Sequence, residues 1–309
     1  MVENAIGFIR TGCHSHFDVG VGDCVPAMGG ASQQKCARQG WVPQFQSGSP
    51  SSGLRWFTEN RCSQPGPVFR PLSVYTVSNT LDKPELHRLA QSVARAGGHL
   101  RVVFIGSTPI GRMPIGHGAK IFCLLHAIEA HAPEDLICLL DAFDILLVGD
   151  LQEMVNEYRK IVADRPPTLL FGAEPWCWPT DPPYEAYCPS YKSGENERYR
   201  YLNAGAYMGP CGALRSLLEA HRDRLSRHMD DQAFFGTCYV EGDAIMLDHS
   251  CRIFQNLIGH DAERDFEWVE AVGRWKNRHT GSYPFVLHGN GPADSRRLLF
   301  DVMGERCGV

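Results

Sequence analysis

The sequence predicts an α/β fold built around a mostly parallel central sheet. Two observations lead to this prediction. From residue 71 onward, short apolar or β-branched runs alternate with longer segments whose apolar residues recur with the period of a helix. One run, 136–140, is apolar at every position, which is typical of a strand covered on both faces. The 43% hydrophobic and 21% charged residues exclude a wholly disordered, collagen-like or coiled-coil chain.

The first half of this region alternates between strands and helices. We expect a strand at 72–77, a helix at 84–96, a strand at 100–105, a helix at 118–131, a strand at 136–140, a helix at 151–162 and a strand at 168–171. β-branched residues favour the first strand, and Asp82 and Gly97-Gly98 bound the first helix. Apolar residues at helical spacing between 121 and 128 form one face of the second helix.

The second half begins with an irregular stretch. Residues 175–199 hold five Pro, two Trp and four Tyr, and such a long loop in a compact domain is usually a lid or a binding loop. Regular structure then resumes. We expect an extended segment at 201–208, helices at 213–228 and 230–239, and short strands at 245–247 and 285–287.

Residues 1–67 differ from the rest of the chain. Gly, Ser and Pro supply 22 of these 67 residues, and the hydrophobic periodicity is poor. We interpret the stretch as a poorly structured N-terminal arm and residues 68–309 as the folded domain. The Cys and His residues between Cys13 and Cys36 could bind zinc, but their spacing fits no standard finger. A loose or disulfide-tied coil is therefore the favoured interpretation.

The amino-acid composition limits which partners and which cellular compartments are possible. The net charge of -5, from 30 basic and 35 acidic residues, gives no indication of a basic surface that would bind nucleic acid. No apolar run approaches the roughly 20 residues of a membrane span, and the first residues lack the features of a signal peptide. Twelve cysteines nevertheless permit a disulfide-forming compartment. The sequence leaves the localisation undetermined and a homodimer open.

Two carboxylates three residues apart follow the apolar run 136–140. Asp141 and Asp144 would lie at the carboxyl end of a strand, where ligands bind in open α/β sheets. Because a buried carboxylate is costly unless it is paired or metal-bound, a divalent cation would satisfy both groups, and it would also bind a diphosphate. The alternative is one capping Asp and one solvated turn Asp. Their position after an apolar strand gives the two interpretations equal weight.

His288 ends a second apolar run and precedes the turn Gly289-Asn290-Gly291. Such a His can supply an imidazole ligand while the turn backbone approaches a phosphate. Taken alone, the motif is better explained as a hairpin turn. In the segment 201–205, Asn203 and Gly205 indicate either close approach of a ligand or a β-bulge.

Asp230 and Asp231 open a predicted helix, where acidic residues interact favourably with the helix dipole. Alone, this explanation leads, although adjacent carboxylates can also act as nucleophile, base or cation stabiliser at a sugar carbon. Trp178 lies in the aromatic loop 175–199, and Trp faces stack on sugar rings.

Taken in order, these segments resemble the glycosyltransferase domain of the procollagen-lysine hydroxylase/glycosyltransferase (PLOD-type) family. The resemblance extends from about residue 72 to 300. The matching stretches are 140–144, 171–174, 177–179, 201–205, 230–232, 247–249, 251–257 and 288–292. The last two are the most specific, and eight segments in the same order are hard to obtain by chance.

The resemblance implies a GT-A fold, which is Rossmann-like, together with Mn2+ and a UDP-sugar donor. In the family, the domain transfers glucose from UDP-glucose to galactosyl-hydroxylysine of collagen, with retention at the anomeric carbon. The implied metal ligands are Asp141, Asp144 and His288; the implied donor-binding residues are Thr76, Ser78, Lys120, Asp141 and Gly291; and the residues implied to face the sugar and the acceptor are Trp178, Asp230, Asp231 and Asn290. Of the donor-binding residues, Thr76 and Ser78 would lie near the uridine and Lys120 near the diphosphate.

The chain departs from the family pattern. Thr and Lys follow the family's His-Gly-Asn-Gly-Pro run, whereas Ala293 and Asp294 stand here, so a cation suited to the diphosphate is lost. The hydroxylase domain and its iron ligands have no counterpart in these residues. The family works in the endoplasmic reticulum lumen, so the resemblance implies the lumen of the endoplasmic reticulum or Golgi, although no signal peptide is visible.

We therefore expect a metal-dependent, retaining hexosyltransferase with a glycan or galactosyl-hydroxylysine acceptor. Asp231, or else Asp230, would stabilise positive charge at the sugar carbon or act as a transient nucleophile, and the loop 175–199 would exclude water. A non-catalytic module that binds glycans or collagen-like chains is the alternative, although the intact motifs argue against it. A nucleotidyl- or phosphoryl-transferring enzyme is a third hypothesis. The sequence does not separate glucose from galactose as the donor sugar.

Overall fold

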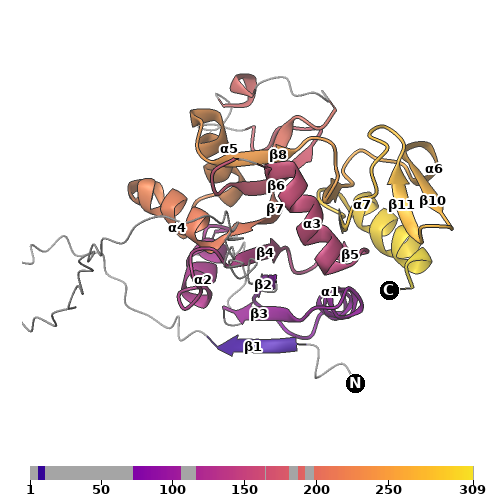
Figure 1. The fold of residues 1–309 in the computed structure, drawn as a ribbon, viewed down its shortest axis with the longest axis horizontal. Helices are drawn as coiled ribbons and strands as arrows, with labels where there is room; N and C mark the ends of the chain where they lie inside the picture. Colours follow the sequence, from indigo (N-terminus) through magenta and orange to yellow (C-terminus); the bar gives the residue numbers. More distant parts are fainter. Residues whose placement is uncertain are drawn as a thin grey trace, which may run out of the picture. The chain divides into compact units, whose positions relative to one another are not determined.

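A computed structural model of the protein describes residues 6–10, 72–105, 116–163, 165–180, 187–191 and 198–308. Their centre is a seven-stranded sheet with the order β1-β3-β2-β4-β7-β6-β8 (Figure 1). In chain order the strands are β1 (Ile6–Arg10), β2 (Ser73–Ser78), β3 (Leu100–Phe104), β4 (Leu136–Leu140), β6 (Leu169–Glu174), β7 (Tyr201–Pro210) and β8 (Ile245–Asp248).

The central sheet is mostly parallel, as predicted. Only β7 runs against its neighbours, and it separates β4 from β6. Leu140 at the end of β4 pairs with Ala206, and Glu174 at the end of β6 pairs with Tyr201. The carboxyl ends of β4 and β6 and the first residues of β7 therefore meet at one edge of the sheet. The pairing of β6 with β7 is shifted between Phe171 and Gly172, which is the β-bulge left open above.

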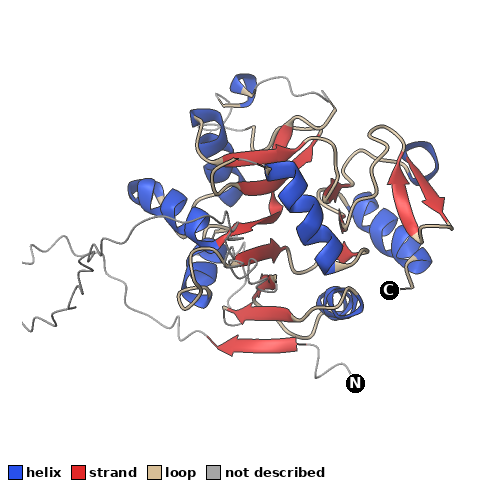
Figure 2. Ribbon diagram, viewed as in Figure 1, coloured by secondary structure: helices blue, strands red, loops and turns tan. Residues whose placement is uncertain are grey.

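Helices cover both faces of this sheet (Figure 2). The helices α1 (Pro84–Arg95) and α3 (Leu151–Val162) share one apolar core with it. The helices α2 (Ala119–Ala127), α4 (Cys211–Ala220) and α5 (Asp231–Glu241) share the other. Burial of apolar side chains in these two layers is the main force that holds the helices to the sheet.

A second, three-stranded sheet packs beside the first. Its order is β5-β12-β9, where β5 is Ile145–Leu147, β9 is Phe254–Asn256 and β12 is Val286–His288. The strand β12 runs antiparallel to β5 and parallel to β9. The remaining C-terminal elements are α6 (Ala262–Asp265), the hairpin of β10 (Phe266–Val269) and β11 (Arg274–Asn277), α7 (Ala293–Arg297) and the π-helical segment η4 (Leu298–Gly304). Short 3-10 turns lie at η2 (Cys188–Ser190) and η3 (Arg222–Arg224).

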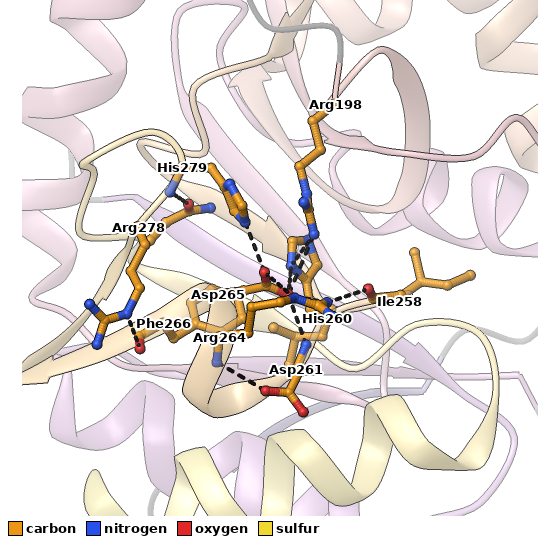
Figure 3. Close-up of polar contacts among 12 residues, drawn as sticks. Arg198, Ile258, His260, Asp261, Arg264, Asp265, Phe266, Arg278 and His279 are labelled. Atoms are coloured by element: carbon orange, nitrogen blue, oxygen red, sulfur yellow. Dashed lines mark hydrogen bonds and ion pairs between the residues drawn. The ribbon is translucent and has the colours of Figure 1, made fainter.

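A buried carboxylate joins the start of β7 to this C-terminal part (Figure 3). The side chain of Asp265 has no exposed surface, and its oxygens lie 2.8 Å from Arg264 Nη2, 2.8 Å from His279 Nε2 and 3.4 Å from Arg198 Nη2. Burial opposes ionisation, but Arg264, the Asp261 backbone N–H and His279 outweigh it and hold the pKa of Asp265 far below its usual range. The network fixes the chain segment that leads into β7.

Two predicted helices are shorter in the structure. The prediction 118–131 corresponds to α2, which ends at Ala127, and the prediction 213–228 corresponds to α4, which ends at Ala220. The second helix stops because His221 turns toward Asp243, with its Nε2 2.7 Å from Oδ2, and the polar segment that follows has no apolar face to bury.

Other elements were not predicted. The strands β1, β5, β9, β10 and β11 and the C-terminal segments α6, α7 and η4 are absent from the sequence-based prediction. Within the expected arm 1–67, the structure describes only β1, which pairs with β3 in parallel. The rest of that expectation, including the zinc alternative, lies outside the described residues, and the domain boundary at residue 68 stays a prediction. Across the described ranges, every helix is too short or too polar to cross a bilayer.

Candidate active site

The side chains of Asp141, Asp144 and His288 form one cluster at the carboxyl edge of the sheet. Asp141 directly follows β4. His288 ends β12, whose pairing with β5 places it opposite Ile145 and so beside Asp144. One ligand atom from each of the three residues lies within 4.8 Å of the other two, and His288 Nε2 is 3.5 Å from Asp144 Oδ1. Two carboxylates and an imidazole suit a divalent cation that prefers oxygen ligands.

Gly205 leaves the space in which this cluster forms. A methyl group on Gly205 would lie 2.9 Å from both Asp141 Oδ2 and His288 Nε2, and it would collide with the His288 ring. The backbone N–H of Asp141 donates to the Gly205 carbonyl at 2.8 Å. Two side chains of the cluster therefore lie close to Gly205, and the close approach of a ligand at this position stays a prediction.

Asn256 sets the orientation of the His288 ring. The Asn256 amide nitrogen donates to the Ala173 carbonyl at 2.9 Å, so its oxygen is the acceptor for His288 Nδ1–H at 2.8 Å. With the proton held on Nδ1, the lone pair on Nε2 faces the two carboxylates. This is the tautomer that a histidine ligand needs.

The three side chains of the cluster shift one another's pKa values. Burial disfavours the charged imidazole, but Asp144 and Asp141 outweigh it and raise the pKa of His288. Burial also raises the pKa of Asp141, although Lys120 opposes the effect. For Asp144, burial is outweighed by His288, so the pKa is lowered. A bound divalent cation would neutralise both carboxylates at once.

Lys120 links this cluster to helix α5. Its Nζ lies 2.8 Å from Asp141 Oδ1 and 2.8 Å from Asp231 Oδ2, and only 12% of its side chain is exposed. Burial disfavours the ammonium, but Asp141 and Asp231 outweigh burial and raise the pKa of Lys120. Lys120 therefore carries its charge and holds Asp231 beside the cluster of Asp141, Asp144 and His288.

The adjacent residues Asp230 and Asp231 have different surroundings. Asp230 caps α5, since its Oδ1 accepts the Ala233 backbone N–H at 2.9 Å. Burial opposes ionisation of Asp230, but His117, whose Nδ1 lies 3.9 Å from Asp230 Oδ2, and the helix N–H groups outweigh it and lower the pKa. The helix-terminus explanation therefore describes Asp230, whereas Asp231 is buried against Lys120.

Glu174 is the site residue that the sequence analysis missed. It ends β6 and is 3% exposed, and it accepts hydrogen bonds from Gln232 Nε2 at 2.7 Å and from Asn290 Nδ2 at 2.5 Å. Burial raises the pKa of Glu174 to about 7, against the effect of these donors. The rule that selected Asp141, a carboxylate at the end of a buried strand, would have selected Glu174 as well.

The aromatic loop presents two tryptophans to solvent. Trp176 and Trp178 are each 55% exposed, and the Cys177 between them forms a disulfide with Cys188. The Trp178 carbonyl accepts hydrogen bonds from Tyr187 Oη and, at 3.3 Å, from Gln232 Nε2. The start of the loop is thereby fixed to α5 next to Glu174.

Comparison of the chain with models of protein families gives a match. The model of the PLOD GT domain matches residues 70–303. The chain belongs to this family. The resemblance stated above is confirmed, and with it the predicted GT-A fold class.

Two curated relatives give the scale of the match. The GT domain is 29% identical over 248 residues to a multifunctional procollagen lysine hydroxylase and glycosyltransferase of Caenorhabditis elegans. The matched stretch covers 76% of this chain and 32% of that protein. The GT domain is 33% identical over 189 residues to uncharacterized protein R699 of Acanthamoeba polyphaga mimivirus, which covers 61% of this chain and 38% of that protein. The chain thus spans about a third of the length of these relatives.

Among solved structures, the GT domain is similar to a glycosyltransferase involved in the glycosylation of the major capsid of PBCV-1. The TM-score is 0.42 and the sequence identity is 10%, over 75% of this chain and 100% of that chain.

The two predicted uridine-binding residues of the GT domain lie on the neighbouring strand β2. Thr76 and Ser78 are both buried. Ser78 Oγ donates to the Thr80 carbonyl at 2.5 Å, whereas Thr76 Oγ1 has no hydrogen-bond partner within the described ranges. Their strand ends at the same edge as β4, but neither side chain hydrogen-bonds to the cluster.

The turn after His288 supplies Asn290 and Gly291. Asn290 Oδ1 accepts the backbone N–H groups of Leu257 and Ile258 at 3.1 and 3.2 Å, so its amide nitrogen points to Glu174. Gly291 adopts φ +85°, a conformation that L side chains rarely take. The predicted residues Asp141, Asp144, Lys120, Asp231 and His288 thus form one connected group, and Asn290 and Trp178 form a second through Glu174 and Gln232.

The departure at 293–294 changes the local charge. Asp294 is exposed and lies 3.3 Å from Arg297 Nη1. Two residues beyond Asp294, Arg296 contributes a positive potential at Asp144 that helps to lower the pKa of that carboxyl. Arg296 on α7 is therefore a cation whose potential reaches Asp144, although Ala293 and Asp294 stand where the family has Thr and Lys.

Proposed function

We propose that this GT domain is a metal-dependent, retaining glycosyltransferase that transfers a hexose from a UDP-sugar, UDP-glucose by resemblance, to a glycan or galactosyl-hydroxylysine acceptor. The observation that carries the proposal is the convergence of Asp141, Asp144 and His288 with Lys120 and Asp231 at the carboxyl edge of the sheet. Membership of the PLOD GT domain family supports the reaction class. The name of the nematode relative supports the acceptor class.

Asp141, Asp144 and His288 would hold the cation, which we propose to be Mn2+. When bound, the cation neutralises the charge that builds up on the UDP leaving group. The space above Gly205 and the Nδ1–H tautomer of His288 suit this role, since both direct the donor atoms toward one point. Lys120 would add positive charge beside the diphosphate, in exchange for its present contact with Asp141.

The second group of residues would handle the sugar. Asp231 would stabilise positive charge at the anomeric carbon or act as a transient nucleophile. Glu174, held by Gln232 and Asn290, would present an acceptor to a sugar hydroxyl. Trp178 would stack on the acceptor and limit access of water to the donor.

UDP release tests the proposal. Purified protein would receive UDP-glucose or UDP-galactose with Mn2+ or with a chelator, with and without a galactosyl-hydroxylysine peptide. We expect Mn2+-dependent release that the peptide stimulates, and we expect Asp144→Ala to abolish it. A thermal melt of Asp144→Ala would establish that the variant is folded.

Each result has a separate meaning. Release without stimulation by the peptide would keep the chemistry and discard the collagen-type acceptor. Release of pyrophosphate in place of UDP would indicate a nucleotidyltransferase. No release with any UDP-sugar, from folded protein, would favour a binding module, and its glycan binding should then survive Asp144→Ala.

A further inference from the structure

A second cluster of metal-binding side chains lies at the far end of α5. His221 follows the last residue of α4, Cys238 lies in the last turn of α5, and Asp243 lies in the turn into β8. One ligand atom from each lies within 4.8 Å of the other two. Two clusters of this kind occur in the described ranges, and the other is the candidate active site. Because α5 has 11 residues, the two ends of this helix are about 16 Å apart.

The three side chains converge on one carboxylate. His221 Nε2 lies 2.7 Å from Asp243 Oδ2, and Cys238 Sγ lies within 4.8 Å of a ligand atom of each. The imidazole, the thiol and the carboxylate therefore lie close enough together to share one cation. The His221 ring is held edge-on by Phe234, with 6.2 Å between ring centroids. The donor atoms are therefore positioned by the ends of two helices before any ligand arrives.

Exposure at the cluster suits an ion that keeps one water ligand. Cys238 is fully buried, whereas the side chains of His221 and Asp243 are 13% and 27% exposed. The carbonyl end of α5 adds a negative partial charge that favours a cation.

We propose that His221, Cys238 and Asp243 bind Zn2+ through one nitrogen, one sulfur and one oxygen atom, with water in the fourth position. Thiolate and imidazole ligands favour zinc, and the candidate active site has no sulfur ligand. On binding, the Cys238 thiol releases its proton to solvent and the sulfur becomes a thiolate ligand. The proton that His221 Nε2 shares with Asp243 moves to Nδ1 or to solvent, so Nε2 is free to bind the ion.

Zinc at this site would join the end of α4, the end of α5 and the turn into β8. Its role would be structural, since α5 carries Asp230 and Asp231 at its opposite end. The inference is independent of the proposed glycosyltransferase activity.

Cobalt is the probe for this site, because a cysteine thiolate bound to Co2+ gives a charge-transfer band that oxygen and nitrogen ligands do not give. Titration of the full chain with Co2+ should produce this band at one equivalent, and Zn2+ should remove it. Cys238→Ser should abolish the band, and His221→Gln should weaken cobalt binding by at least tenfold. Cys307→Ser is the matched control, since Cys307 is a free, partly exposed thiol outside the cluster, and the band should persist in it.

Thermal melts provide a second measurement. Zn2+ should raise the melting temperature of the wild type and of Asp144→Ala, which lacks a ligand of the other cluster, but not that of Cys238→Ser. The proposal is overturned if folded wild-type protein shows no charge-transfer band, or if the band persists in folded Cys238→Ser. It is equally overturned if zinc stabilises Cys238→Ser as much as the wild type.

Discussion

The side chains of the proposed metal site come from two distant parts of the chain, 141–144 and 288, and meet over a glycine. A Cβ at Gly205 would lie 2.9 Å from Asp141 Oδ2 and from His288 Nε2, closer than real Cβ contacts allow. Gly205→Ala should therefore displace a ligand and weaken Mn2+ binding by at least tenfold, which corresponds to about 1.4 kcal/mol. Mn2+ titration followed by paramagnetic relaxation of water would measure the affinity.

Gly281→Ala is the matched control for this substitution. Gly281 has φ +72° with no atom within 4 Å of an added Cβ. The change should cost about 1 kcal/mol of folding free energy because of the left-handed backbone, while Mn2+ affinity stays at the wild-type value. Equal Mn2+ affinity in Gly205→Ala and wild type would contradict the inference that Gly205 leaves the space needed by the metal ligands.

Arg296 is the candidate replacement for the cation that the family carries after the Gly-Pro turn. Its positive potential reaches Asp144, so Arg296→Ala should raise the KM for the UDP-sugar about fivefold, an effect of about 1 kcal/mol and the upper end for an exposed charge. The neighbouring variant Arg297→Ala removes the same charge from a side chain that pairs with Asp294. It should leave KM nearly unchanged. Equal KM values for the two variants would remove Arg296 from the donor site.

Glu174 gives a pH dependence with a defined sign. Its folded-state pKa of about 7 exceeds the ordinary value of 4.5, so the buried neutral form is favoured in the fold. Stability is fully present below pH 4.5 and declines as the pH rises to about 7, by about 3 kcal/mol in the metal-free protein. Glu174→Gln should abolish this part of the decline.

Urea unfolding at several pH values between 4.5 and 8 would measure the difference between wild type and Glu174→Gln. The exposed Glu219 offers a control, because Glu219→Gln should follow the wild-type profile. Parallel profiles for the wild type and Glu174→Gln would refute the raised pKa.

At the residue scale, the sequence predicts which groups could bind a metal but not how they are held. Asp141, Asp144 and His288 were selected because each follows an apolar run and because the motifs resemble the family. The support for His288 comes from Asn256, whose amide bonds depend on pairing between strands far apart in the sequence. The effect of Arg296 on Asp144 has the same origin, since the position of α7 near Asp144 follows from the tertiary fold.

At the element scale, the disulfide between Cys177 and Cys188 fixes the loop that carries Trp178. Its two cysteines are 11 residues apart, so chain entropy alone assigns the bond about 3 kcal/mol. In the double variant Cys177→Ser/Cys188→Ser, we expect the acceptor KM to rise roughly tenfold, the factor that accompanies a loss of about 1.4 kcal/mol. The KM for the UDP-sugar should change little.

Steady-state kinetics with varied acceptor and varied donor would separate the two KM values. Cys307→Ser is the control, since Cys307 is a free thiol remote in sequence from the loop. An unchanged acceptor KM in the double variant would show that the loop needs no cross-link to bind acceptor.

Strands and helices were predicted correctly where burial determines the pattern of apolar residues. The strand 136–140 and the helix 151–162 match β4 and α3, because their side chains face apolar layers. The strand β9 was missed because two of its three residues, Gln255 and Asn256, are polar although buried. Gln255 Oε1 accepts from Asn277, and the Asn256 amide bonds to Ala173 and His288, all distant in sequence. Hydrophobic periodicity cannot detect a strand of this kind.

At the scale of the whole molecule, β1 changes what the N-terminal segment is expected to do. The sequence predicts that removal of residues 1–67 leaves a folded, active domain. In the structure, Ile6–Arg10 pair with Leu100–Phe104 at the edge of the central sheet. Their removal would expose the backbone N–H and C=O groups of β3, and an unprotected edge strand promotes association between molecules.

Two deletions distinguish these outcomes. One removes residues 1–67, and the other removes residues 14–67 and joins the ends with a Gly-Ser linker of about ten residues. Such a linker can span the roughly 20 Å between the end of β1 and the start of β2, given the rise along a strand and the spacing between strands. We expect the first variant to form dimers or larger species at micromolar concentration in light scattering, and the second to behave like the full chain. Monomeric, active protein from the first deletion would restore the sequence-based expectation and show that β3 tolerates a free edge.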